Sequence, residues 1–150
     1  MDVALNGLRR RSARGRGRWQ RRGISLLEAA MVLPIVLLLT FGLIEYAWIF
    51  LKSQQVASAA RNGARAASLP DAQQGEVVES VRQYLEDRGL DGEGVAAIVL
   101  TPANLSDASS GEHVEVSVTV DYQKVSITGL RLIPRPESLG SSTTMAKEGP

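Results

Sequence analysis

Few side chains in this sequence could carry out chemistry. The chain has 150 residues, with no cysteine and one histidine, His113. The lack of cysteine excludes a disulfide, a thiol nucleophile and a Cys-ligated metal site, and a single histidine excludes a two-histidine metal site within one chain. The composition therefore disfavours an enzyme, and we expect no catalytic residue, no metal site and no cofactor.

The one histidine lies in a segment that could resemble a ligand site. His113 and Glu115 are two residues apart, and Asp121 follows at an even spacing, so all three would share one face of a strand. The intervening positions, from Val114 to Tyr122, are alternately apolar, as in a half-buried strand. Because such a strand needs polar residues on its outer face in any case, a solvated face is the preferred interpretation.

Two carboxylates stand out because their surroundings are apolar. Residues 29–44 carry no charge, Glu28 precedes them and Glu45 follows them. An ionisable group at bilayer depth costs at least about 2.5 kcal/mol and usually has a partner. Glu45 could reach water at the outer interface. Glu28 could reach the cytoplasmic face, or it could pair with a cation of another chain.

The elements that position these carboxylates begin with a membrane span. Residues 24–51 are long enough to cross a bilayer as a helix, with a kink expected at Pro34. The preceding residues 1–23 are basic, whereas the sequence from Ile24 onward has 9 basic and 15 acidic residues. This asymmetry predicts a cytoplasmic leader and an extracytoplasmic body, and it favours a topology signal over a nucleic-acid-binding arm. The basic residues of the leader are Arg9, Arg10, Arg11, Arg14, Arg16, Arg18, Arg21 and Arg22.

The junction between leader and span has a recognisable order of residues. Gly23 ends the basic stretch, Ile24 begins the apolar one, and Glu28 is the fifth residue after Gly23. This order resembles a type IV prepilin-like signal. The resemblance implies cleavage after Gly23, a free amine on Ile24, and pairing of Glu28 with that amine on a neighbouring subunit. An ordinary secretory signal is disfavoured because the apolar stretch is too long and is interrupted by Glu45.

Several spaced motifs extend this resemblance over residues 21–68. They are Glu28-Ala-Ala-Met-Val-Leu-Pro34, Phe41-Gly42-Leu-Ile-Glu45-Tyr46, Gln54-Gln55 and Ala59-Ala-Arg61-Asn-Gly63-Ala-Arg65-Ala66. Together they resemble the TadE-like family, the pseudopilins or minor pilins of the tight-adherence (Flp) pilus machinery. The resemblance implies a single-span protein of the bacterial inner membrane, processed by a prepilin peptidase. It marks Pro34, Gly42, Glu45, Arg61, Gly63 and Arg65 as further motif positions.

Residues 52–150 are expected to form an extracytoplasmic α+β domain. Residues 52–68 continue the membrane helix. Their small side chains at helical spacing predict packing on the chain's own domain, contact with other subunits, or both on different faces of the helix. A second helix follows, with Asp71 as N-cap, Gln74 as its capping-box partner and Gly89 at its end.

Three stretches then predict a small antiparallel sheet of three to four strands. They are residues 95–101, residues 112–122 and the C-terminal residues 141–148. Residues 125–128 could extend the second strand after a bulge. The expected fold class is thus α+β, with a long pilin-like helix and a second helix packed on this sheet.

Two functions remain after these exclusions, because a secreted hydrolase has no marked pair of catalytic groups. The first is a structural pilin-like subunit whose partners are other pilin-like subunits, the assembly platform, the prepilin peptidase and the lipid bilayer. The second is an uncleaved, single-pass membrane-anchored binding module. Gly23 with Glu28 favours the first, since a plain anchor needs neither.

Overall fold

A computed structural model describes residues 16–90, 96–127 and 134–149, with side chains described from Ile24 onward except at Ala96. The chain divides into two compact units, residues 1–40 and 41–150. Helix α1 (Arg16–Ala67) provides all of the described part of the first unit and continues into the second. The α+β class expected from the sequence is confirmed: a long apolar helix, a further helix and a three-stranded antiparallel sheet.

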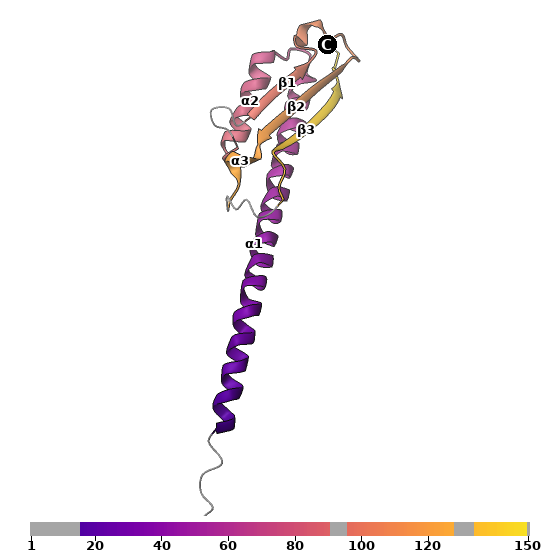
Figure 1. The fold of residues 1–150 in the computed structure, drawn as a ribbon. Coiled ribbons are helices and arrows are strands. Elements are labelled where there is room, and N and C mark those ends of the chain that lie inside the picture. Colours follow the sequence, from indigo (N-terminus) through magenta and orange to yellow (C-terminus); the bar gives the residue numbers. More distant parts are fainter. Residues whose placement is uncertain (1–15, 91–95, 128–133, 150) are drawn as a thin grey trace, which may run out of the picture. The chain divides into compact units, whose positions relative to one another are not determined.

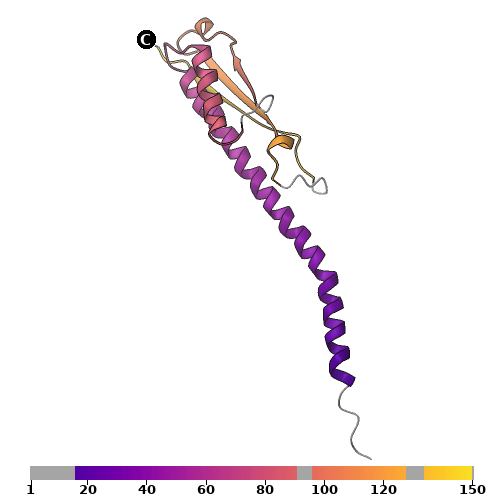
Figure 2. The same ribbon diagram turned by 90° about the vertical axis from the view of Figure 1, so that its left-hand side faces the viewer.

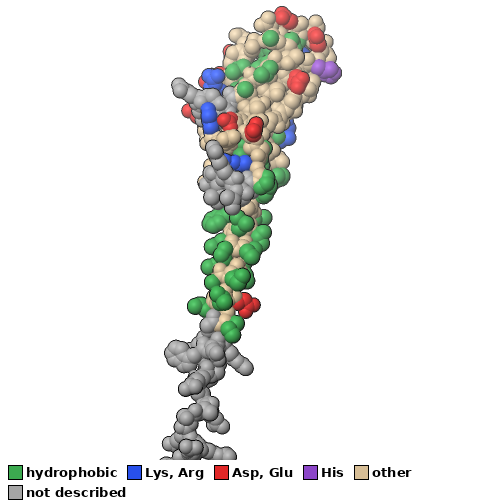
Figure 3. All heavy atoms as spheres, in the orientation of Figure 1, with side chains coloured by type: hydrophobic (Ala, Val, Ile, Leu, Met, Phe, Trp, Pro, Cys, Tyr) green, Lys and Arg blue, Asp and Glu red, His purple; other side chains and the backbone are tan. Residues whose placement is uncertain are grey.

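Helix α1 has two chemically different parts. Through residues 24–44 nearly every large apolar side chain is exposed, and the space-filling view shows hydrophobic side chains along this part (Figure 3). Among the described residues, Ile24–Ala67 is the one helix that is long and apolar enough to cross a membrane. Pro34 lies inside α1, and the helix continues through it.

The second unit is an antiparallel sheet with two helices on one face (Figures 1 and 2). Strands β1 (Ala96–Thr101), β2 (His113–Asp121) and β3 (Ser138–Ala146) lie in that order. Helix α2 (Gln74–Glu86) and the last turns of α1 cover the face that carries the valines of β2. A 3-10 turn, η1 (Leu105–Asp107), and a short helix, α3 (Tyr122–Val125), complete the unit.

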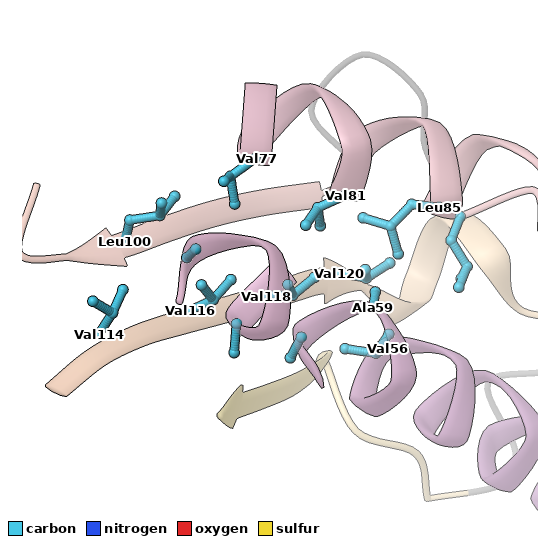
Figure 4. Close-up of a cluster of buried hydrophobic side chains, with 14 of the residues drawn as sticks. Val56, Ala59, Val77, Val81, Leu85, Leu100, Val114, Val116, Val118 and Val120 are labelled. Carbon is cyan, nitrogen blue, oxygen red and sulfur yellow. The ribbon is translucent and has the colours of Figure 1, made fainter. Parts of the chain in front are cut away.

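The core forms where period-two and helical patterns meet. Val114, Val116, Val118 and Val120 alternate along β2 and are fully buried. Figure 4 shows these valines facing side chains from both helices. The small-residue stripe of α1 belongs to this core, so packing on the chain's own domain is the alternative that the structure supports. Its buried members are Val56, Ala59, Ala60, Gly63, Ala64 and Ala67.

Two local predictions were wrong. Helix α2 begins after Gln73, which makes no side-chain capping hydrogen bond, so Asp71 and Gln74 do not form a capping box. Residues 122–125 form helix α3 and do not extend β2; Thr128 lies outside the described residues. The end of α2 is as predicted, because Gly89 has a φ of 61° and the Leu90 amide donates to the Leu85 carbonyl at 2.9 Å.

Candidate functional site

The predicted processing site lies in the first unit, within helix α1. Gly23 and Ile24 are both helical, so a peptidase that needs an extended substrate must first unwind the helix there. Ile24 is exposed, and so is Glu28 one helical turn later. The Glu28 carboxylate has no hydrogen bond or ion pair to any residue whose side chain the structure describes. It is therefore a single charged group on an exposed apolar helix surface.

Glu45 has the opposite environment, because its side chain is fully buried in the second unit. Its Oε1 atom accepts a hydrogen bond from the Tyr122 hydroxyl at 2.7 Å and one from the Ser126 hydroxyl at 2.8 Å. Arg135 adds a cation at the edge of this cluster by donating from Nη1 to Ser126 Oγ at 2.9 Å. The buried carboxylate is thus satisfied by residues about 80 positions along the chain.

The same cluster changes the acidity of Tyr122. Burial raises the pKa of its hydroxyl above the ordinary value, and the hydrogen bond to Glu45 and the negative charge of Glu45 raise it further. Tyr122 therefore stays protonated as a donor to the carboxylate throughout the physiological pH range. We call Glu45, Tyr122, Ser126 and Arg135 the Glu45 cluster.

Three further bonds join the same stretch of α1 to the rest of the second unit. Tyr46 donates its hydroxyl to the Pro134 carbonyl at 3.1 Å, and Trp48 donates Nε1 to the Val125 carbonyl at 2.7 Å. Lys52 donates Nζ to the Arg88 carbonyl at 2.8 Å and lies 4.9 Å from the centre of the Trp48 ring. These contacts fix residues 45–52 of α1 to the chain around α3 and to the end of α2.

The motif around Gly63 combines close packing with an exposed basic face. A Cβ atom on Gly63 would lie 2.6 Å from Val81 Cγ2 of α2 and 3.0 Å from Val116 Cγ1 of β2. Only glycine allows this close approach of α1 to both elements. Arg61 and Arg65 lie on the exposed side of the helix, where Arg61 donates to Ser58 Oγ at 3.2 Å. Pro34 and Gly42, the other motif positions, lie within α1, and Gly42 is half-buried.

The polar residues of β2 lie on the outer face of the sheet. His113 is exposed, Glu115 accepts a hydrogen bond from Ser142, and Asp121 accepts one from the Gln123 amide at 2.9 Å at the start of α3. Among the described residues, no group of three or more His, Asp or Glu side chains is arranged to hold a metal ion. The carboxylates of this strand thus have structural partners of their own.

Sequence reasoning selected Glu45 but missed the residues that bind it. Tyr122 was assigned to the apolar face of a strand, which explains its burial, but nothing in that pattern indicates where its hydroxyl points. Ser126 lies in the stretch predicted to extend the strand, and no sequence pattern singles out Arg135. The available signal was Glu45 itself, since a carboxylate within an apolar stretch requires a hydrogen-bond donor once it is buried.

Comparison with known proteins locates the family resemblance in α1. A family model described as TadE-like protein matches residues 23–65, which begin at Gly23 and include Glu28, Glu45 and the Gly63 motif. No curated protein and no solved structure matches the chain. The family match indicates a protein associated with the tight-adherence pilus, and the TadE-like resemblance of the sequence is confirmed: residues 23–65 are a TadE-like segment.

Proposed function

We propose that this chain is a pseudopilin or minor-pilin-like structural subunit of a tight-adherence pilus or a related secretion apparatus. The observation that carries the proposal is the TadE-like match, whose first residue is Gly23, next to the bond at which a prepilin peptidase would cut. In this proposal the leader is cytoplasmic, and the predicted span, residues 24–51, anchors the chain in the bacterial inner membrane through its exposed apolar part, residues 24–44. The sheet domain lies outside the cytoplasm. Its partners are other pilin-like subunits, the assembly platform and the peptidase.

Cleavage after Gly23 would change the electrostatics of the helix end. It would leave a positively charged amine on Ile24, which the intact chain does not have. The Glu28 carboxylate is exposed among apolar side chains and is unpaired within the described residues. Because an isolated charge at bilayer depth is unfavourable by about 2.5 kcal/mol or more, pairing with the amine of a neighbouring subunit would favour assembly.

The test of processing is the N-terminal sequence and intact mass of the membrane-extracted chain, produced with and without a prepilin peptidase. We expect a new N-terminus at Ile24 that depends on the peptidase. An intact N-terminus in both samples would support the uncleaved, membrane-anchored binding module. A start near Ala60 would indicate a released soluble domain and would contradict the pilus proposal.

The test of assembly is the substitution Glu28→Gln, which keeps the shape and removes the charge. We expect normal membrane insertion and normal processing, but at least a tenfold loss of the chain from sheared pilus or pseudopilus fractions. Glu76→Gln is the matched control, because Glu76 is also exposed but lies on α2 of the domain. Recovery of Glu28→Gln at the level of the unsubstituted chain would remove the electrostatic argument.

A further inference from the structure

The Glu45 cluster marks where lipid can no longer surround helix α1. From Ile24 to Ile44 the helix has 21 residues, or about 31 Å at 1.5 Å per residue, which matches the roughly 30 Å hydrocarbon layer. Glu45 is the next residue, and the domain covers it completely. The carboxylate therefore lies in protein, at the level where the hydrocarbon layer ends.

The residues that cover Glu45 must then lie at the same level. Tyr122 and Ser126 contact its Oε1 directly, and Val125 accepts the Trp48 bond less than one turn further along α1. Helix α3 and Ser126 are thereby held beside Glu45 and Trp48 within the second unit. Figure 1 shows α3 beside α1 within the second unit.

The exposed surface of this part of the domain combines apolar and cationic side chains. Ile127 is 53% exposed, and Lys124, three residues earlier, is also exposed. On α1, Tyr46 is 52% and Phe50 67% exposed. Apolar side chains beside lysine or arginine are typical of the interfacial zone of a bilayer. There the aromatic and aliphatic side chains enter the edge of the hydrocarbon layer, and the cations contact anionic headgroups.

We propose that the part of the domain around α3 is a membrane-surface site. Residues 122–127, with Arg135 hydrogen-bonded to Ser126, rest on the bilayer and bind its anionic phospholipid headgroups. Ile127 enters the interfacial zone, and Lys124 lies at the level of the phosphates. The Glu45 cluster attaches this surface to the part of α1 that belongs to the second unit. The inference needs membrane anchoring of the chain but not its assembly into a pilus.

The absence of native cysteine allows a direct depth measurement on the full chain. Ile127→Cys is labelled with an environment-sensitive fluorophore and placed in nanodiscs that contain one copy of the chain. Thr144→Cys is the matched control, because Thr144 is exposed near the other end of the sheet, in register with Glu115. Helical and sheet content by circular dichroism confirms that both variants are folded.

We expect the label at position 127 to be quenched at least twofold by brominated lipid and to resist aqueous iodide, with the opposite pattern at position 144. Equal access of iodide to both positions would overturn the proposal. Protection of position 127 only when several copies share a disc would also overturn it, because it would assign this surface to a neighbouring subunit. Since a single copy is used, failure of pilus assembly would not affect the result.

The charge arm tests the headgroup chemistry. In nanodiscs with anionic phosphatidylglycerol, lipid quenching at position 127 should exceed that in pure phosphatidylcholine, and Lys124→Glu should abolish the difference. Arg82→Glu, on the exposed surface of α2, is the control and should leave it unchanged. No dependence on lipid charge in the unsubstituted background would overturn the anionic-headgroup part of the proposal.

Discussion

At the scale of single residues, the two carboxylates that border the apolar stretch have different roles. Glu28 is exposed and unpaired among the described residues, whereas Glu45 is buried and accepts two hydroxyl hydrogen bonds at one oxygen. A buried charge with partners stabilises a fold only as long as every partner stays in place. Glu45 therefore has its partners within the chain, and Glu28 is the carboxylate that is suited to contact another chain.

Removal of the Tyr122 hydroxyl tests the Glu45 cluster. Tyr122→Phe should lower the free energy of unfolding by about 2 kcal/mol, because the buried carboxylate loses a charge-assisted donor. Tyr84→Phe is the control, since Tyr84 is a half-buried tyrosine whose hydroxyl makes no hydrogen bond that the structure records. Chemical denaturation of the detergent-solubilised chain measures both, and equal stability of the two variants would contradict the role of the cluster.

The raised pKa of Tyr122 gives this loss a pH dependence. Below about pH 10, tyrosine is protonated in both the folded and the unfolded chain, so the hydroxyl contributes its full stability. Above about pH 10 the unfolded chain loses the proton while the folded chain keeps it, and stability falls as pH rises. The difference in free energy of unfolding between the unsubstituted chain and Tyr122→Phe should therefore become smaller between about pH 9 and pH 11.5. A difference that stays constant over this range would contradict the raised pKa of Tyr122.

At the scale of elements, the last turns of α1 are shaped by the sheet and α2 together. The side chains of the stripe are small because α1 lies close to β2, and at Gly63 no side chain fits at all. This explains how residues 59–67 combine alanine and glycine with arginine: one face of the helix packs inward, and the other is solvated. The close contact with Val81 and Val116 thus requires glycine at position 63, whereas Arg61 and Arg65 lie on the exposed face.

Gly63→Ala should be destabilising by about 1–3 kcal/mol, because the added Cβ overlaps a stiff valine side chain on each side. Gly75→Ala is the matched control in the first turn of α2, where a Cβ meets nothing within 4 Å. That substitution should raise stability by about 0.5–1 kcal/mol through the lower entropy of the unfolded chain. The melting temperatures of both variants test this prediction. A change of the same sign in the two melting temperatures would be inconsistent with the close approach at Gly63.

The elements that the sequence predicted correctly are those with a long, consistent period. Strand β2 was predicted from five alternating apolar residues, and the buried stripe of α1 from its helical spacing. Residues 125–128 also alternate between apolar and polar side chains, but the neighbouring strands do not reach them. The pairing with β1 ends at Ala96, opposite Val120, and the pairing with β3 ends at Ser138, opposite Asp121. Without a partner strand, the Asp121 side chain instead caps α3. The pairing of Glu45 with Tyr122 was beyond sequence reasoning because it depends on tertiary position.

At the scale of the whole molecule, the two units obtain their stability from different solvents. Residues 24–40 expose apolar side chains along a helix whose backbone is satisfied internally, so lipid or detergent stabilises it. Residues 41–150 have a core of their own, built from α1, α2 and the sheet, which water stabilises through the hydrophobic effect. A denaturant that unfolds the core of residues 41–150 should therefore leave residues 24–40 largely helical.

We expect guanidinium chloride to unfold the chain in dodecyl maltoside micelles in one cooperative step that leaves a helix of about 20 residues. In a Trp19→Phe background, Trp48 reports the domain alone, because its indole donates to the Val125 carbonyl only in the folded state. The Trp48 transition should coincide with the partial loss of helical signal by circular dichroism. Val116→Asp, which places a charge in the core, should show the residual helix without the transition. Loss of the entire helical signal together with the Trp48 change would show that the domain, and not the detergent, holds residues 24–40 in a helix.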